Sequence, residues 1–405
     1  MNPSSLSELT RWVTEAGLAG KSETTILEGF CRRAVAGGLP IARAGIIIDT
    51  LHPIHEGRVF RWRSDDSGEP KLLEYGPTNE GAVAASWQAS PFFRMLQDGS
   101  SVLRRRLFTA ETLEFPGLID HQNDGMTDYL ALINRFAEEG TIGEMDCVYS
   151  YWVTDRVGGF VGDQIDALVT LMPKLALSIK CVSLARIAET LVETYLGRDA
   201  GRRVLGGHIH RGVTETISAA LWYSDLREFT RITDQAEPQH IIPLLNDYAE
   251  AVISAVHDHG GDVLKLIGDG VLAVFTGENS EMSCESAMAA ETTLRHHLTE
   301  LNRRRAADGL PITDAYLGLH VGDVFYGNIG SKERLDFTVV GPAVNEVSRI
   351  AAMCRSVDRG LLVSEAFADS MSEAQRTRLV SVGRYALRGV EQPQHLYTRE
   401  PLTSI

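Results

Sequence analysis

Residues 260–275 constrain the fold of this chain more than any other stretch. The segment GGDVLKLIGDGVLAVF places two apolar runs on either side of a Gly-Asp-Gly turn. Apolar runs joined by so short a turn predict a β-hairpin with Asp269 at its tip. An aspartate in a tight turn usually serves the turn itself, because its side chain hydrogen-bonds the nearby backbone. Two other segments favour a functional role for this one.

A second carboxylate follows a second predicted strand. Residues 217–224 are apolar enough for a buried strand, and Asp225 comes directly after them, where a helix can begin. Asp225 and Asp269 together offer two anionic oxygen donors. Mg²⁺ takes this kind of ligand from a protein before phosphate and water complete its octahedron. The two aspartates therefore predict a metal site that also binds phosphate.

Side chains suited to a nucleotide occur in the same part of the chain. Residues 335–340 predict a strand, and a Gly-Pro pair then predicts a helix with proline in its first turn. On this helix Asn345 and Arg349 are four residues apart and share one face. Lys265 lies on the predicted hairpin. Together with the two carboxylates, these residues form the constellation of a nucleotide polyphosphate site.

Three separated motifs carry a family resemblance. They are YSDLREFT at 223–230, KLIGDG at 265–270 and GPAVNEVSR at 341–349. In this order they resemble the catalytic domain of the class III adenylate and guanylate cyclases, over residues 213–398. The resemblance implies an adenylate cyclase, in which the 3′-hydroxyl of ATP attacks the α-phosphorus to give 3′,5′-cyclic AMP and pyrophosphate.

The resemblance also implies how metal and phosphate are held. Two Mg²⁺ or Mn²⁺ ions per active site are expected to bind Asp225, Asp269 and the backbone carbonyl of Leu226, as in other two-metal sites. Backbone N–H groups up to Phe229 and Thr230 are expected to bind phosphate oxygens, because they lie at a helix start.

Five further residues complete the implied site. Asn345 orients the ribose, and Arg349 meets the charge that develops at the α-phosphate. Lys265 and Thr338 read adenine, because the ammonium donates to N1 and the threonine accepts from the 6-amino group. Arg388 is the nearest cation for the terminal phosphates. In the family the metal carboxylates come from one chain, and the residues that correspond to Lys265, Thr338, Asn345 and Arg349 come from the other, which implies a homodimer with two shared active sites.

Two alternatives stay open at this point. A guanylate cyclase would use the same fold, although Lys265 favours ATP, and a catalytically weak nucleotide-binding signalling protein would keep part of the site. Thr338 in place of aspartate resembles the subgroup that includes bicarbonate-responsive cyclases. Glu228 and Pro342 depart from the family pattern. Glu228 adds a negative charge near the phosphates, so it either lowers affinity or points outward.

The order of elements in the C-terminal region predicts an α+β fold, an α/β sandwich. Strand, helix, two strands, helix and strand follow one another in the ferredoxin-like βαββαβ order, which the class III cyclase core resembles. A hairpin and two late strands extend it. The predicted elements are 217–224, 238–257, 262–275, 283–305, 314–320, 324–329, 336–340, 380–387 and 395–397.

Residues 1–162 predict a separate regulatory domain. Short helical patterns precede strands at 42–49, 58–62, 102–107 and 146–154, which together suggest a compact α+β sensory module. The pattern, with GFVGD leading into a long helix, resembles a GAF domain. Its ligand or partner is unknown.

Residues 163–212 predict a helical linker and a jointed connector. Leu168, Met172, Leu175, Ile179 and Val182 are spaced 4-3-4-3, as in the seam of a parallel coiled coil. Alternatively this helix packs on its own domain, because fewer than three heptads are present. Residues 195–207 contain four glycines and resemble the transducer element that precedes many cyclase domains.

The composition of the chain limits the classes of partner and the cellular compartment that we expect for this protein. A formal charge of −15 argues against a nucleic-acid partner or an anionic membrane surface. Five scattered cysteines without a Cys-x-x-Cys pair fit reduced thiols in a cytosol. Because no uninterrupted apolar run is long enough to span a bilayer, a cytoplasmic protein is expected.

Overall fold

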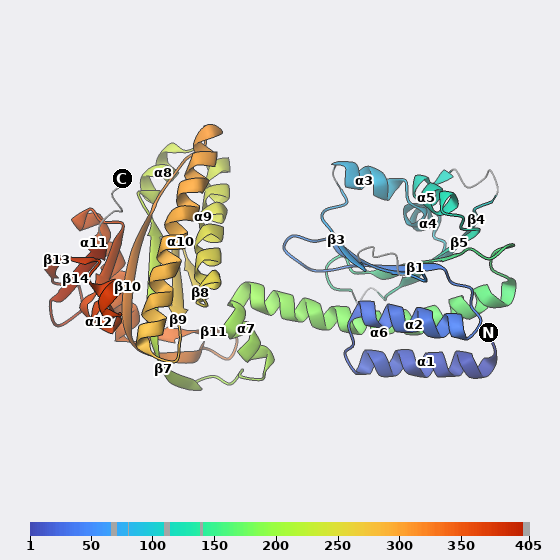
Figure 1. Cartoon of the computed structure of the whole chain (residues 1–405), viewed down its shortest axis with the longest axis horizontal. Helices are drawn as coiled ribbons and strands as arrows, with labels where there is room; N and C mark the ends of the chain where they lie inside the picture. The colour runs from blue at the N-terminus through green and yellow to red at the C-terminus, as the bar shows by residue number, and fades with distance from the viewer. Residues whose placement is uncertain (66–70, 80, 109–113, 138–140, 400–405) are drawn as a thin grey trace. The chain divides into compact units, whose positions relative to one another are not determined.

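The computed structural model describes residues 1–65, 71–79, 81–108, 114–137 and 141–399. The chain divides into two compact units, unit 1 (Met1–Leu191) and unit 2 (Val192–Ile405). Within the described residues each unit consists of one sheet with helices packed against it (Figure 1).

Unit 1 is built on an antiparallel sheet in the order β3-β2-β1-β6-β5-β4. Four of its strands match predicted ones, whereas β3 and β5 were not predicted. The strands are β1 (Arg43–Asp49), β2 (Gly57–Arg63), β3 (Leu72–Tyr75), β4 (Val102–Arg106), β5 (Asp128–Arg135) and β6 (Cys147–Thr154).

Helices cover both faces of this sheet (Figure 1). On one face, three long helices enclose a core in which the rings of Phe30 and Trp152 lie 5.3 Å apart. On the other face, shorter helices and loops pack against Tyr129 and Tyr149. The long helices are α1 (Pro3–Leu18), α2 (Glu23–Ala36) and α6 (Gly162–Leu196), and the shorter ones are α3 (Gly81–Gln88), α4 (Pro91–Asp98) and α5 (Ile119–Asn123).

Helix α6 packs inside unit 1 along its predicted seam. All five residues from Leu168 to Val182 that were predicted to form a coiled-coil seam are buried in the core with residues of α1 and α2. Arg186, next in that series, pairs with the buried carboxylate of Glu23 at 2.8 Å. The coiled-coil prediction for this seam is therefore wrong, and the alternative of packing on its own domain is confirmed. Unit 1 extends past residue 162 because α6 completes its core.

By length and composition alone, α6 is the one described helix that could cross a membrane. Its most apolar stretch has a mean hydropathy of 1.6, and 44% of that stretch is buried. The sequence predicted no segment able to span a membrane, and α6 is an exception to that prediction by length and composition only. Burial against α1 and α2 explains the apolar composition equally well.

A buried ion pair closes the far edge of the unit 1 sheet. Asp128 on β5 is fully buried, and its carboxylate accepts hydrogen bonds from Arg104 at 2.6 Å and from the backbone N–H of Phe160 at 2.9 Å. A buried carboxylate needs such partners, because its desolvation is costly. Asp128 therefore attaches the segment that leads into α6, at Phe160, to the sheet.

Unit 2 has a larger sheet in the order β13-β14-β12-β10-β7-β9-β8, with β11 paired to β10. The strands are β7 (Thr214–Leu226), β8 (Asp262–Ile267), β9 (Gly270–Phe275), β10 (Ala315–Gly330), β11 (Leu335–Val340), β12 (Leu361–Ser364), β13 (Leu379–Tyr385) and β14 (Gln394–Arg399). The helices are α7 (Arg198–Leu205), α8 (Phe229–Gln235), α9 (Pro238–Asp258), α10 (Ser280–Ala307), α11 (Pro342–Val357), α12 (Glu365–Ser370) and α13 (Glu373–Arg376).

The helices of unit 2 divide between the two faces of its sheet. Helices α9, α10 and α12 pack on one face, and α11 packs on the other. Helix α11 comes very close to β10 at Gly318, where a β-carbon would lie 2.6 Å from the backbone nitrogen of Ala351. The order β7, α9, β8, β9, α10, β10 follows the predicted βαββαβ plan, with α8 added after β7.

Two predicted boundaries in unit 2 differ from the structure. The strands expected at 314–320 and 324–329 form one continuous strand, β10, because both parts pair with β7. Asp225 lies within β7 rather than after it. Both differences lengthen the ladder between β7 and β10.

The connector before the sheet is docked on unit 2. After Gly197, which has a φ of +87°, the short helix α7 places Asp199 beside the sheet. Asp199 accepts hydrogen bonds from Tyr326 of β10 at 2.8 Å and from Arg203 at 2.7 Å. The arginine side chain also lies over the Tyr326 ring. The connector is thus held by polar contacts.

Candidate active site

Asp225 and Asp269 lie side by side in unit 2. Ser224 of β7 pairs with Val271 of β9, so the turn that carries Asp269 reaches the end of β7. The two side chains share a hydrogen bond. Burial, this hydrogen bond and the neighbouring negative charge raise the pKa of Asp225 to about 7.

This pair fits the predicted metal site. Two carboxylates held together, one of them with a raised pKa, are the arrangement that a divalent cation would stabilise. Leu226 buries its side chain in the core, which leaves its main chain to contribute oxygen. Among the described residues no cluster of three or more His, Cys, Asp or Glu forms a complete metal cage. Phosphate and water would have to supply the remaining ligands.

Glu228 adopts an unusual backbone conformation next to this pair. Its φ of +56° is in the left-handed region that favours glycine, and it precedes α8 directly. Its carboxylate pairs with Arg231 of the same helix at 2.5 Å. The side chain is therefore neutralised locally, which favours the outward-pointing alternative. Phe229 packs partly against the core, and Thr230 is exposed.

Lys265 forms an ion pair that the sequence did not indicate. Its ammonium group on β8 contacts the carboxylate of Asp336 on β11. Thr338 lies two residues further along β11 and therefore on the same face of the strand. Strand β11 thus brings Thr338 to the side of the sheet where Lys265 lies. Side chains alternate between the two faces of a strand, so the position of Asp336 two residues before Thr338 could have indicated that both side chains face Lys265.

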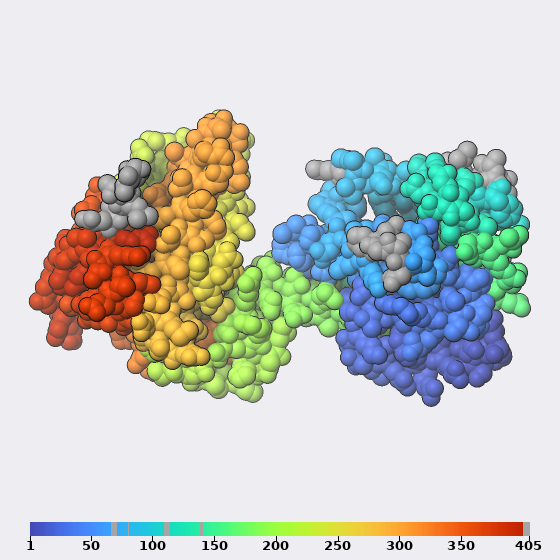
Figure 2. Space-filling view, viewed as in Figure 1, coloured from blue at the N-terminus to red at the C-terminus, as the bar shows by residue number. Residues whose placement is uncertain are grey.

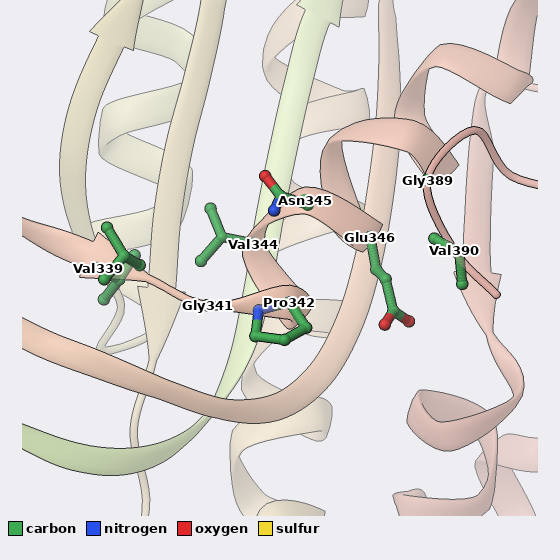
Figure 3. A pocket seen from close by; sticks show the side chains of 9 residues that line it. Val339, Gly341, Pro342, Val344, Asn345, Glu346, Gly389 and Val390 are labelled. Carbon is green, nitrogen blue, oxygen red and sulfur yellow. The ribbon is translucent and has the colours of Figure 1, made fainter.

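Asn345 lines a pocket at the start of α11. The pocket has a volume of about 540 Å³, and its wall includes Gly341, Glu346 and Val390 (Figure 3). Gly389 and Val390 belong to the loop after β13, so the exposed Arg388 lies at the edge of this pocket.

Arg349 follows Asn345 by one helical turn and is exposed. It has no ion pair within the part of the chain that the structure describes. An exposed cation on the same helix face as Asn345 is accessible to a ligand phosphate. Pro342 begins α11, where the missing N–H costs no hydrogen bond.

Within one chain, the start of α11 is far along β10 from the residue that pairs with Asp225. Asp225 pairs with Tyr316 of β10, whereas Gly341, at the start of α11, lies against the carbonyl oxygen of Asp323. These two positions on β10 are separated by about 20 Å of extended strand. The structure therefore groups the carboxylates at one end of β10 and the pocket of Asn345 towards the other.

Residues 213–399 match the family model described as the adenylate and guanylate cyclase catalytic domain. This part of the chain is a class III cyclase catalytic domain. The match covers β7 to β14 and includes every predicted site residue.

Several curated relatives share the cyclase domain. The chain is 30% identical over 165 residues to an adenylate cyclase of Anabaena cylindrica, covering 41% of this chain and 33% of that protein. It is 27% identical over 188 residues to adenylate cyclase 1 of Rhizobium meliloti, covering 45% and 28%. The chain thus spans about a third of the length of such relatives. A solved structure, the adenylyl cyclase CyaB from P. aeruginosa, is 23% identical with a TM-score of 0.43, covering 47% of this chain and 96% of that one.

A polar cluster behind the pocket of the cyclase domain was also missed. His320 on β10 is buried, and its ring contacts the hydroxyl of Ser364 at 2.8 Å and the carboxylate of Glu346 at 3.6 Å. Burial lowers the pKa of His320 to about 4. Because these residues come from β10, β12 and α11, only the fold brings them together.

Proposed function

We propose that this protein is an adenylate cyclase that converts ATP to 3′,5′-cyclic AMP and pyrophosphate. The observation that carries the proposal is the contact between Asp225 and Asp269 inside a cyclase catalytic domain. Two carboxylates in contact provide the anionic oxygen that a magnesium nucleotide requires.

The aspartates and Leu226 would hold two ions, Mg²⁺ or Mn²⁺. When bound, such ions lower the pKa of the 3′-hydroxyl and neutralise phosphate charge. Backbone N–H groups up to Phe229 and Thr230 bind phosphate oxygens. The local pairing of Glu228 with Arg231 supports this role, since it reduces repulsion of the phosphates.

Residues of the Asn345 pocket act on the rest of the nucleotide. Asn345 orients the ribose, and Arg349 stabilises the charge that develops at the α-phosphate. Arg388 binds the terminal phosphates, and its position next to Gly389 and Val390, which line the same pocket, supports this role. The exposure of both arginines supports these roles.

Lys265 and Thr338 select the base. An ammonium donor matches N1 of adenine, whereas guanine presents N1–H at that position. Asp336 pairs with the lysine ammonium group at the partly exposed end of β11. The alternative, a guanylate cyclase, would need an acceptor where Lys265 donates.

The active site is shared between two copies of the chain. Supporting this, the pocket that Asn345 lines lies at the start of α11, about 20 Å along β10 from the residue paired with Asp225. Exposed apolar side chains also lie near Lys265 and Thr338, as expected for a covered surface. They are Leu266 (55% exposed), Ile267 (46%), Phe325 (51%) and Val340 (42%).

Unit 1 is a regulatory module, and a GAF-like sensory domain is the type we propose. Its antiparallel sheet with helices on both faces supports this type. A cytoplasmic location fits five free cysteines, four of them buried.

The deciding experiment uses the full-length protein with ATP or GTP and Mg²⁺ or Mn²⁺, with the product identified by mass. Cyclic AMP is expected from ATP, and Asp225→Ala or Asp269→Ala should abolish it. Cyclic GMP as the main product would favour the alternative. Activity that survives in EDTA or in either variant would rule out the two-metal site.

A further inference from the structure

Arg355, in the last turn of α11, lies near the end of the sheet that carries the aspartate pair. The thiol of Cys354, one residue before it, donates to the carbonyl oxygen of Leu317 on β10 at 3.4 Å. Leu317 is next to Tyr316, which pairs with Asp225 across the ladder between β7 and β10. The C-terminal end of α11 is therefore fixed beside the end of β7 that carries Asp225.

Asp225 and α11 lie on the same face of the unit 2 sheet. Leu226 packs in the core with α9 and α10, so the alternation along β7 turns Asp225 to the opposite face. Tyr223, two residues before Asp225, packs on that opposite face with Val347 of α11. Figure 2 shows α10, in orange, over the face that Leu226 occupies. A ligand therefore reaches Asp225 from the side of α11.

The guanidinium group of Arg355 is accessible to a ligand. Arg355 is exposed, and within the part of the chain that the structure describes it makes no hydrogen bond or ion pair. The neighbouring Asp358 pairs with Arg227 instead, at 3.3 Å. Burial and Asp269 raise the pKa of Asp225, and the positive charge of Arg355 opposes them. The guanidinium group is thus within electrostatic reach of the aspartate pair and remains free to bind an anion.

We infer that Arg355 binds the β- or γ-phosphate of the nucleotide, from the same chain that supplies the two aspartates. The inference rests on the proposed function, in which a metal ion on the aspartates holds the polyphosphate. A planar guanidinium group matches two phosphate oxygens at once. In the proposed two-chain site Arg349 comes from the other chain, so Arg355 supplies a cation from the chain that bears the carboxylates.

An arginine at this position also has a simpler explanation. The C-terminal end of a helix attracts a positive charge through the helix dipole, and that role needs no nucleotide. The two roles differ in what the loss of Arg355 changes. A dipole contact contributes to folding stability only, whereas a phosphate contact contributes to the binding of phosphate.

The first experiment measures the binding of inorganic pyrophosphate with Mg²⁺ to the full-length protein by calorimetry. Arg355→Ala should weaken this binding roughly tenfold, as expected for the loss of a charge-assisted hydrogen bond. Arg355→Lys should restore part of it, because the charge is kept. The matched control Arg359→Ala removes an exposed arginine that donates only to the carbonyl oxygen of Asp358, and it should bind as wild type does. Unchanged pyrophosphate binding in Arg355→Ala, with a lower melting temperature, would overturn the inference in favour of the helix dipole.

The second experiment asks which half of the shared site contains Arg355. Arg355→Glu should lose cyclase activity, because it places a negative charge beside the phosphates. Co-expressed with Arg349→Ala it should recover about a quarter of wild-type activity, since the two changes damage opposite halves. Co-expressed with Asp225→Ala it should stay inactive, since both changes damage the same half. The reverse pattern would place Arg355 in the other half and overturn the inference. Pyrophosphate binding by Arg355→Ala decides the question if Arg355→Glu does not fold.

The two experiments separate this inference from the proposed function. If no cyclic nucleotide forms but Arg355→Ala still weakens pyrophosphate binding, the proposed function is removed and the phosphate contact remains. If cyclic AMP forms and Asp225→Ala with Arg349→Ala recovers activity, while Arg355→Ala binds pyrophosphate as wild type does, only this inference fails.

Discussion

The carboxyl groups of Asp225 and Asp269 are hydrogen-bonded to each other, although one lies on β7 and the other in the turn between β8 and β9. Burial and the second carboxyl raise the pKa of Asp225 to about 7, far above the usual range of an aspartate. At neutral pH the metal-free pair is therefore partly protonated, and a cation would displace that proton.

The first prediction concerns stability and pH in EDTA. The folded-state pKa of Asp225 is raised above the unfolded value, so its contribution to stability is complete below the unfolded pKa and is lost as pH rises through about 7. The unfolding temperature of unit 2 should fall more steeply from pH 5 to 8 in wild type than in Asp225→Asn. Scanning fluorimetry measures both profiles. Parallel profiles would show that Asp225 titrates normally.

The second prediction concerns base selection. Lys265→Glu with Thr338→Cys reverses the donor and acceptor pattern that faces the base. The ratio of kcat/KM for ATP over GTP should fall by at least about tenfold, because unpaired polar groups in a binding pocket are costly. Asp336→Asn serves as the control. Since the Lys265–Asp336 pair is partly exposed, this variant should change the ratio much less. A folded double variant with an unchanged ratio would exclude the two residues as base readers.

The third prediction concerns the shared site. Asp225→Ala and Arg349→Ala should each be inactive, because each breaks a different half of the site. Co-expressed chains that pair at random should form one intact site in about half of the dimers, which restores about a quarter of wild-type activity. If both variants are folded and dimeric but the mixture stays inactive, the site lies within one chain.

The fourth prediction concerns the stability of unit 1. Asp128→Ala leaves Arg104 and the Phe160 N–H without their buried acceptor, which should cost about 3–5 kcal/mol. Asp124→Ala removes a carboxylate that is 50% exposed and pairs with Arg43. This control should cost much less than Asp128→Ala, because solvent screens an exposed ion pair. Urea unfolding measures the free energy of unfolding of both variants. Equal losses of unfolding free energy in Asp128→Ala and Asp124→Ala would contradict the role of Asp128.

The fifth prediction concerns regulation. Removing residues 1 to 191 should change turnover, ATP affinity or dimerisation, because α6 leads from the core of unit 1 to the connector docked on Tyr326. Steady-state kinetics and light scattering measure these quantities. If all three are unaltered, unit 1 has no regulatory role in the isolated protein.

Local patterns predicted the catalytic half of this chain well. The hairpin with Asp269 and the strand before Asp225 are encoded within short segments, where alternation and turn chemistry are decisive. Asp336 and the His320–Glu346 pair were missed, because their partners are distant in sequence. On α6, periodicity alone does not show whether the predicted stripe packs on its own domain or on a second copy. The structure buries the stripe that contains Leu168.

The long ladder between β7 and β10 has a mechanical consequence. These strands pair from Thr214–Gly327 to Leu226–Ala315 without interruption, and α11 is pressed onto β10 at Gly318. A slip by one residue would turn every side chain of β7 to the opposite face, so the ladder moves only as a stiff body. The end of β7 that carries Asp225 and the helix that carries Asn345 therefore belong to one rigid body. In the proposed two-chain site, opening and closing around a nucleotide would then take place at the edges of this rigid body, where one chain would meet the other or where the β8–β9 hairpin bends.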